Sequence, residues 1–240
     1  MKTRIILSFV IAASLATTTL SSCHIGCVKG SGNKTIEKRQ IGNFEKIDIS
    51  GGFTVNLKQD STGNLNVTAD DNLMKYIRTE VSGSKLRIFT RKDLCNRAPV
   101  VIDLSVRNLK EVKSSGAVEL NSNSKINVKD LTLEFSGASK VDMDINAAKL
   151  KTKASGATEL NLKGQAASHE VKVSGAGKLF ATDLVVGSYK IETSGAVNCK
   201  INVLQSLTTN TSGASEIQYR GAPSEINSHK SGASSIKHID

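Results

Sequence analysis

The chain has 240 residues, of which 4% are aromatic and none is tryptophan, and its 32 basic and 22 acidic residues give a formal net charge of +10. This length suits a single β domain with one core. The basic balance is compatible with an anionic glycan, a lipid or an envelope protein as a partner. The simpler explanation is that lysine is the polar residue on the outside of many strands. It does not indicate a nucleic-acid-binding protein, because no basic cluster is interleaved with aromatic residues.

The first residues are typical of a bacterial export signal. Lys2 and Arg4 precede a mostly apolar run over residues 5–16, which is short for a membrane span of about 20 residues. The sequence Leu20-Ser21-Ser22-Cys23 then matches a bacterial lipobox. We therefore expect residues 1–22 to be a lipoprotein signal peptide and the thiol of Cys23 to carry a lipid. The alternative is an ordinary secretory signal that happens to contain a cysteine.

Residues 23–38 are expected to form a lipidated linker, and residues 39–240 the folded domain. The polar stretch 28–40 contains glycine, serine and charged residues, and this composition suits a flexible spacer. No second apolar stretch in the sequence is long enough to span a bilayer. We expect a protein exported from the cytoplasm to the cell envelope and lipid-anchored to a membrane, with the outer membrane as the expected one.

Three cysteines remain after Cys23, namely Cys27, Cys95 and Cys199. An odd number in an oxidising compartment is not a complete disulfide framework, and the spacings do not match a zinc site. A bond between Cys27 and Cys95 stays open at this stage.

A short repeat dominates the rest of the sequence. Ser-Gly-Ala occurs seven times at intervals of 18 to 21 residues, and a fixed period of this length is typical of a solenoid. The repeats are Ser115-Gly116-Ala117, Ser136-Gly137-Ala138, Ser155-Gly156-Ala157, Ser174-Gly175-Ala176, Ser194-Gly195-Ala196, Ser212-Gly213-Ala214 and Ser231-Gly232-Ala233.

Side-chain polarity alternates on both sides of each repeat. The fifth residue after each serine is apolar in every repeat, from Leu120 to Ile236. The second residue before each serine is polar in every repeat, from Lys113 to His229. This alternation indicates strands with one buried face, so each repeat is predicted to be a strand, a tight corner and a second strand.

The motif itself is interpreted as the corner. Glycine can adopt the positive φ that a sharp bend needs, and serine can bond local backbone groups. Alanine is expected to point into a tight interior. If the repeats stack at about 4.8 Å, the serines form a hydroxyl ladder, and Glu119, Lys140, Glu159 and Lys178 alternate in sign along the stack. Cys199 falls in the column of apolar residues and is predicted to be a buried free thiol.

These patterns predict an all-β fold: a single-stranded parallel β-helix-like solenoid with rungs of about 20 residues and a less regular, strand-rich N-terminal part. A helical solenoid is excluded because no segment of the repeats has apolar residues at helical spacing. In the N-terminal part, residues 47–57 match the repeat, and Val81-Ser82-Gly83-Ser84 is interpreted as a shortened version of it. Residues 73–77 are expected to form a short helical turn.

The chain resembles the head GIN domain family of bacterial envelope proteins, which are grouped as auto-transporter adhesins. The resemblance rests on the lipobox, on the opening sequence from Ile41 to Phe53 and on the Ser-Gly-Ala repeats, and it covers residues 39–240. It implies an all-β, β-helix-like fold and a place in the cell envelope. It brings no catalytic motif to this chain.

Few residues suggest chemistry. The histidines His24, His169, His229 and His238 are interpreted as surface residues, and no cofactor or metal is expected. The pairs Asp70/Asp71 and Asp142/Asp144 are interpreted as solvated, with Ca²⁺ binding or catalysis as the alternative. Asp60-Ser61-Thr62 resembles an O-glycosylation acceptor in a polar loop, with Ser61 as the acceptor.

We therefore expect a non-catalytic, adhesin-like binding module for a glycan, lipid or protein partner. The alternative is a carbohydrate-active enzyme, a polysaccharide lyase or hydrolase on a β-helix. Because the last repeat lies nine residues from Asp240, the final rung is expected to be an open edge that allows end-to-end self-association.

Overall fold

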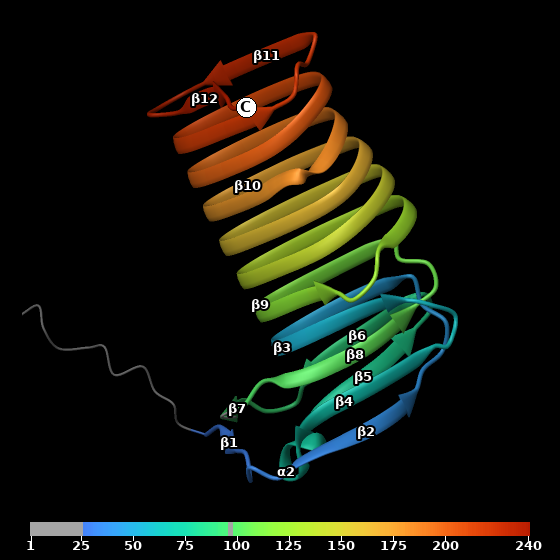
Figure 1. Ribbon diagram of the computed structural model, residues 1–240. Helices are drawn as coiled ribbons and strands as arrows, with labels where there is room; N and C mark the ends of the chain where they lie inside the picture. The colour runs from blue at the N-terminus through green and yellow to red at the C-terminus, as the bar shows by residue number, and fades with distance from the viewer. Residues whose placement is uncertain (1–25, 96–97) are drawn as a thin grey trace, which may run out of the picture.

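A computed structural model describes residues 26–95 and 98–240 of the chain. The described residues are nearly all in strands, with one four-residue helix and no closed barrel. Figure 1 shows a pile of stacked coils above a smaller group of separate strands. Cys23 and the predicted signal peptide lie outside the described residues.

The strands differ greatly in length. In chain order they are β1 (Val28–Lys29), β2 (Lys34–Gln40), β3 (Lys46–Gln59), β4 (Asn64–Asp70), β5 (Ile77–Ser82), β6 (Lys85–Thr90), β7 (Leu94–Cys95), β8 (Val100–Val106), β9 (Glu111–Ser122), β10 (Ile126–Arg220), β11 (Glu225–Lys230) and β12 (Ser235–His238). The helix α2 (Asp71–Met74) begins two residues before the predicted helical turn and overlaps it at Leu73 and Met74.

The repeats pair with one another in parallel and in register. Ser115 of β9 lies opposite Ser50 of β3 on one side and Ser136 of β10 on the other. Strand β10 then runs without a break for 95 residues, and Figure 1 shows it winding through successive coils. The last two strands, β11 and β12, also pair in parallel with β10. The repeat predicted from the sequence is therefore a repeat of paired strands.

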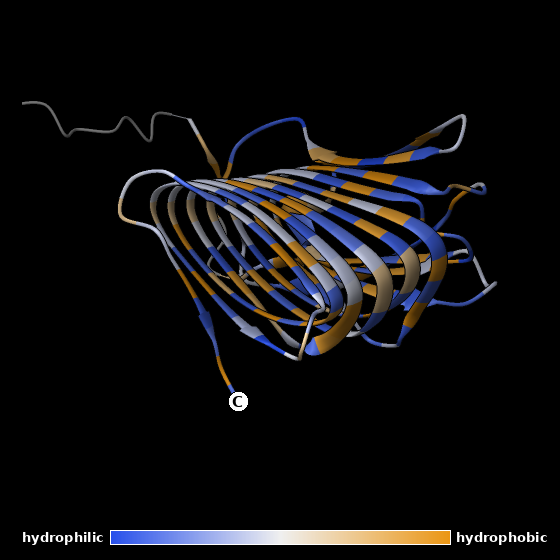
Figure 2. Ribbon diagram, turned by 90° about the horizontal axis from the view of Figure 1, so that it is seen from above, coloured by the Kyte–Doolittle hydropathy of each residue, from blue (hydrophilic) through white to orange (hydrophobic). Residues whose placement is uncertain are grey.

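The predicted apolar column is buried except at Ile236, which is partly exposed. Leu120, Val141, Leu160, Leu179, Cys199 and Ile217 are each at most 1% exposed. The side chain of Cys199 is a buried free thiol, as predicted. Figure 2 shows the hydropathy alternating along each coil, which is the pattern of a strand with one face toward the core.

The repeat glycines have the predicted positive φ, for example +107° at Gly116 and +92° at Gly175. They also stack closely on one another, a contact that the sequence pattern does not predict. A Cβ atom on Gly175 would lie 2.8 Å from the carbonyl oxygen of Gly156, and one on Gly156 would lie 2.5 Å from that of Gly137. Glycine is therefore required at these corners for two independent reasons.

The expectation that the repeat alanines point into a tight interior is wrong. All seven, from Ala117 to Ala233, are exposed. In most repeats the next residue is buried instead, as at Val118 and Val197. The left-handed glycine therefore separates a buried residue before the serine from a buried residue after the alanine, and the three motif residues face outward.

Two expectations for the N-terminal part also need correction. The segment containing Gly83 is not a shortened repeat, because β5 and β6 form an antiparallel hairpin around it. Residues 28–40 are not a flexible spacer throughout, because β2 pairs with β4 over seven residues. By contrast, residues 47–57 align with β9 as predicted, with Gly51 opposite Gly116.

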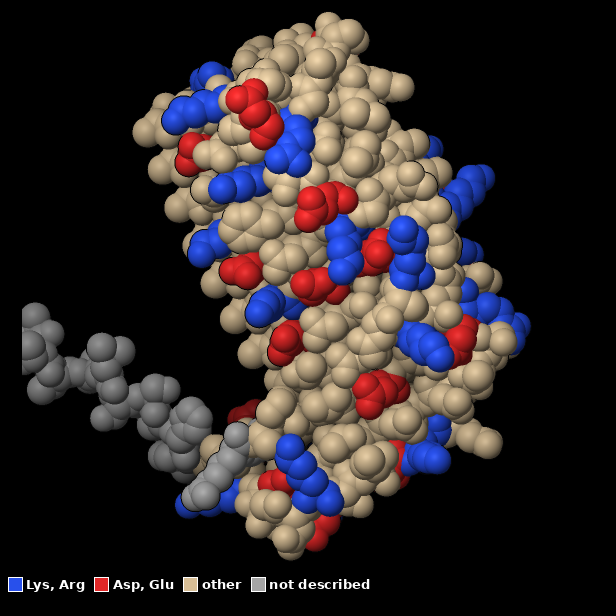
Figure 3. Space-filling view, viewed as in Figure 1, with Lys and Arg blue, Asp and Glu red and all other residues tan. Residues whose placement is uncertain are grey.

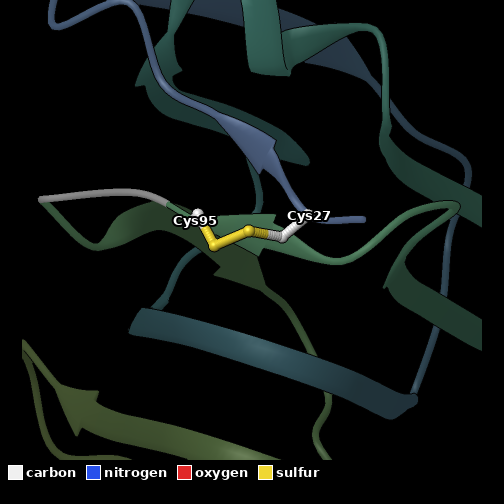
Figure 4. The surroundings of a disulfide bond; sticks show 2 residues. All are labelled: Cys27 and Cys95. Carbon is white, nitrogen blue, oxygen red and sulfur yellow. A yellow bond between two sulfur atoms is a disulfide. The ribbon is translucent and has the colours of Figure 1, made fainter. Parts of the chain in front are cut away.

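The question left open for the cysteines is answered by a disulfide between Cys27 and Cys95 (Figure 4). The bond joins Cys27, directly before β1, to Cys95 of β7, and β1 and β7 also pair in parallel. It fixes the beginning of the described chain to the strands that form the lower end of the molecule in Figure 1. Within the described residues, no helix has the length and hydropathy of a bilayer crossing.

Candidate binding groove

A groove of about 700 Å³ runs along the coils beside the repeat serines. Two columns of outward side chains line it, with the buried residues Ser114, Phe135, Ala154, Val173 and Thr193 between them. The serine column consists of Ser115, Ser136, Ser155, Ser174, Ser194 and Ser212, and the charged column consists of Asp48, Lys113, Glu134, Lys153, Lys172 and Glu192, followed by the uncharged Asn210. The two columns lie two residues apart on the same outward face of each strand, so every coil adds one member to each.

The charged column is a ladder of ion pairs between successive coils. Glu134 lies between Lys113 and Lys153, at 3.1 Å and 2.9 Å from their ammonium groups. Two coils further along the chain, Lys172 lies 2.9 Å from Glu192. A neighbouring column extends the ladder, with Lys151 and Glu170 3.2 Å apart. In Figure 3, basic and acidic side chains are interspersed over the visible face.

The ion pairs were expected in a different column, the one that contains Glu119, Lys140, Glu159 and Lys178. Within the described residues, no ion pair joins Glu119 to Lys140 or Glu159 to Lys178. The charges two residues before each serine pair instead. The register places both columns in line across the stack, since Lys113 lies opposite Glu134 and Glu119 opposite Lys140, so the difference lies in the side-chain positions. The sequence pattern predicted the stacking but not which column is close enough to bond.

The ion pairs keep the groove carboxylates ionised. Lys153 and Lys113 lower the pKa of Glu134, and Lys172 and Lys190 lower the pKa of Glu192. In return, Glu134 and Glu111 raise the pKa of Lys113, and Glu192 raises that of Lys172. Each charge is therefore largely compensated by a neighbour, so the groove presents many polar groups but no strong field of one sign.

The serine column is only partly engaged in hydrogen bonds. Ser115 donates to the Ser50 hydroxyl at 3.3 Å, and Ser136 and Ser212 donate to the backbone carbonyls of Ser114 and Thr193 at 3.2 Å. In the described part of the chain, the hydroxyls of Ser155, Ser174 and Ser194 bond no other protein group. Three neighbouring coils thus present free hydroxyls to the groove, rather than the continuous ladder expected.

The alanine column lies outside this groove. It lines two separate hollows, one with Ala117, Ala138 and Ala157 and one with Ala176, Ala196, Ala214 and Ala233. The left-handed glycines therefore form a boundary between the groove and a second surface, where the alanine methyl groups lie beside charged side chains such as Lys140 and Lys178.

The other predicted site residues are not brought together. Ser61 is exposed, in a loop where Thr62 donates its backbone N–H and its hydroxyl to Asp60, so its glycosylation stays a prediction. Asp70 is not solvated as expected: it is 8% exposed, and its carboxylate accepts a bond from the backbone N–H of Gly32 at 3.1 Å. Asp144 lies 3.8 Å from Lys125. Among the described residues, no three potential ligands gather closely enough to hold a metal ion.

His169 is not a surface residue, and this expectation is wrong. It is 1% exposed, its Nε2 lies 2.9 Å from the Thr152 hydroxyl, and its ring centroid lies 5.1 Å from that of Tyr189. Burial lowers the pKa of His169 to about 3. The sequence could have predicted this burial, because His169 lies five residues before Ser174. Residues one and three positions before the serine point inward in most repeats, so alternation places the fifth position inward as well. His229 and His238 are exposed, as expected.

Comparison with known proteins places this geometry in context. The family model described as "Putative auto-transporter adhesin, head GIN domain" matches residues 43–223. No curated protein is detectably similar in sequence.

Solved structures share the fold. A putative adhesin from Bacteroides fragilis is 20% identical over 88% of this chain and 100% of its own, with a TM-score of 0.82. A putative lipid binding protein from Parabacteroides distasonis is 22% identical over 89% and 99%, with a TM-score of 0.72. A putative adhesin from Parabacteroides merdae is 21% identical over 90% and 100%, with a TM-score of 0.67. At these identities the likeness shows the fold alone.

Proposed function

The chain belongs to the head GIN domain family of auto-transporter adhesins, and from this premise we propose that it is a non-catalytic, adhesin-like binding module of the cell envelope. Cys23 carries the lipid that tethers it, and the coils form a parallel β-helix that presents the groove. The partner is a linear, hydroxyl-rich glycan that lies along the serine column.

The observation that carries this proposal is the regular repetition of polar groups in the groove. Each coil from Ser115 to Ser194 presents one serine hydroxyl and one charged side chain. Among the residues that the structure describes, the hydroxyls of Ser155, Ser174 and Ser194 bond no other protein group. A surface whose groups recur at the strand spacing of about 4.8 Å suits a partner that is itself a linear repeat. Hydroxyls and charged groups offer both donors and acceptors, which is what sugar hydroxyls require.

The compensated charges favour a neutral glycan over a polyanion. Lys113, Lys153 and Lys172 are each within 3.1 Å of a groove carboxylate. A polyanion would have to compete with these carboxylates for the ammonium groups, whereas a neutral glycan bonds both members of a pair. The basic balance of the whole chain, which is compatible with anionic partners, therefore does not decide the ligand of this groove.

The groove does not favour the enzyme alternative. A polysaccharide hydrolase needs one carboxylic acid with a raised pKa to protonate the leaving oxygen. The pKa values of Glu134 and Glu192 are lowered instead, by the lysines beside them. The groove carboxylates are thus suited to ion pairing and hydrogen bonding rather than to general acid catalysis.

Two experiments test the proposal. Cys23→Ser should abolish partitioning of the protein into a detergent phase, and unchanged partitioning would rule out the anchor. Affinity electrophoresis of the purified protein through gels containing laminarin, dextran, xylan or alginate should show retardation by at least one neutral polysaccharide. Retardation by alginate alone would show that the ligand is a polyanion, and retardation by none of the four would contradict glycan binding.

A further inference from the structure

The end of the molecule that carries the disulfide is also where the described chain begins. Figure 1 shows β1, β7 and α2 at the end opposite β11 and β12. Cys27 lies four residues after Cys23 in the sequence, and four residues span at most about 14 Å. The bond from Cys27 to Cys95 therefore allows little separation between position 23 and this end of the domain.

Four exposed cations surround this point, namely Lys29, Lys75, Arg91 and Lys92. Contacts hold the segments that carry them together. The backbone carbonyl of Lys29 accepts a bond from the Asn72 side chain at 2.8 Å, and the backbone N–H of Arg91 donates to the carbonyl of Tyr76 at 2.9 Å. We call these four residues and Tyr76 the basal patch.

The cations of the basal patch differ from those of the groove. Within residues 26–95 and 98–240, none of the four has a carboxylate within 4.0 Å, whereas Lys113, Lys153 and Lys172 all do. Two exposed carboxylates, Asp71 and Asp93, belong to the same segments. Asp71 already accepts bonds from the Ser31 hydroxyl and the Asn72 backbone. The patch thus keeps a net positive charge that its own acids do not neutralise.

Tyr76 adds an aromatic group to this charge. The ammonium groups of Lys75 and Lys92 each lie 5.3 Å from the centroid of its half-buried ring. Lysines with flexible stems beside a tyrosine are a combination suited to the boundary between water and a bilayer, where the ring and the stems lie among the head groups.

We propose that the basal patch binds the anionic head groups of the membrane that anchors the protein. This inference rests on the lipid anchor of the proposed function, because the short chain from Cys23 to Cys27 is what holds the patch at head-group level. The lipid anchor and the basal patch then bind the same membrane surface, and two attachments hold a domain more firmly than either one alone. The coils stand away from the bilayer, with β11 and β12 distal.

The test uses the lipidated protein reconstituted on liposomes of phosphatidylcholine alone or with one third phosphatidylglycerol. Amide hydrogen exchange in residues 72–76 and 91–93 should slow at least threefold on the anionic liposomes relative to the neutral ones. The protection should disappear in 0.5 M NaCl, because head-group attraction is screened by salt. Equal exchange on the two liposomes would overturn the proposal.

A matched pair of variants supplies the control. Lys75→Glu/Arg91→Glu/Lys92→Glu should lose the protection, whereas Lys140→Glu/Lys163→Glu/Lys178→Glu, with the same change of charge on exposed positions of the coils, should keep it. Equal loss in both variants would show a general effect of net charge and contradict the patch.

Failure of the anchor can be separated from failure of the patch. If the protein does not float with neutral liposomes, the anchor is wrong. The patch is then tested by flotation with the anionic liposomes, which should be at least tenfold greater for wild type than for the basal variant. Equal flotation of the two would overturn the patch.

Discussion

The carbonyl oxygen of Gly156 lies 2.8 Å from where a Cβ atom on Gly175 would be placed, and Gly175 has a φ of +92°. Both the backbone conformation and the stacking of the coils therefore exclude a side chain at this position. Real Cβ atoms do not approach a carbonyl oxygen so closely, so a larger residue must push two coils apart.

Gly175→Ala should reduce the free energy of unfolding by about 2–5 kcal/mol, since backbone strain and overpacking add. Gly83→Ala is the matched control, because Gly83 also has a positive φ of +57° but a Cβ there would meet nothing within 4 Å. Chemical denaturation of both variants measures the difference. Equal losses would show that the coils do not stack as closely as described.

Ala176→Leu should change the free energy of unfolding by less than about 0.5 kcal/mol, because the side chain faces solvent in a surface hollow. Leu179→Ala, three residues later, should cost about 2–5 kcal/mol, because that side chain is fully buried. Thermal melts of the two variants test the assignment of the two faces. A large loss for Ala176→Leu would mean that the alanine points inward after all.

The stability of the protein should fall with acid between pH 6.5 and 4.5 because of His169. Its pKa is lowered by burial from 6.5 to about 3. In this range the unfolded chain takes up a proton at this site and the folded chain does not, so the free energy of unfolding falls by about 1.4 kcal/mol per pH unit once the pH is well below 6.5.

His169→Leu should remove that part of the pH dependence. The groove carboxylates, whose pKa values are lowered, lose their stabilising effect mainly below their ordinary pKa of 4.5. That loss is common to the variant and to wild type, so the difference between the two proteins measures the effect of the histidine. Urea denaturation at pH 7.0, 6.0 and 5.0 makes the comparison. The same slope in the variant and in wild type would contradict the buried, neutral state of His169.

The C-terminal edge should resist association through its charges. β11 and β12 pair with β10, and in β11 the apolar side chain of Ile226 is 46% exposed. Lys237→Ile should promote end-to-end oligomers, because an exposed apolar edge strand recruits further strands. Lys153→Ile, in the middle of the coils, should not. Light scattering on the two variants distinguishes them, and identical behaviour would indicate that the edge is already covered.

Much of the fold could be predicted because two features of the repeat indicate it, namely its spacing and its alternation of polar and apolar residues. The positive φ of the seven repeat glycines and the burial of the column from Leu120 to Ile217 follow from the spacing of Ser-Gly-Ala and from simple alternation. The prediction for the alanines was wrong because the alternation of polarity was applied on each side of the corner but not through it. The alanine has an even offset from the serine, like the polar residues two positions before the serine and four positions after it, so alternation carried through the corner predicts that it is exposed. The glycine is the position that departs from the alternation.

The groove was harder to predict. Its two columns were identified, but Lys113 lies opposite Glu134 and Glu119 lies opposite Lys140 in the same register, so the pairing depends on side-chain positions that the sequence does not give. The Cys27–Cys95 bond could not be derived either, since the two residues lie 68 apart in an irregular part of the chain. The burial of His169 could have been predicted by extending the alternation of buried and exposed positions two residues further before the serine.

The central claim is that the serine column binds a linear glycan, and blocking that column tests it most directly. Ser155→Tyr would fill the groove at a coil whose hydroxyl is free, whereas Ala157→Tyr, two residues later, adds the same side chain to the alanine surface. The two proteins are compared by affinity electrophoresis in the neutral polysaccharide that retards wild type. We expect Ser155→Tyr to weaken the retardation at least tenfold and Ala157→Tyr to leave it unchanged. Full retardation of Ser155→Tyr, or its loss in Ala157→Tyr alone, would contradict this account.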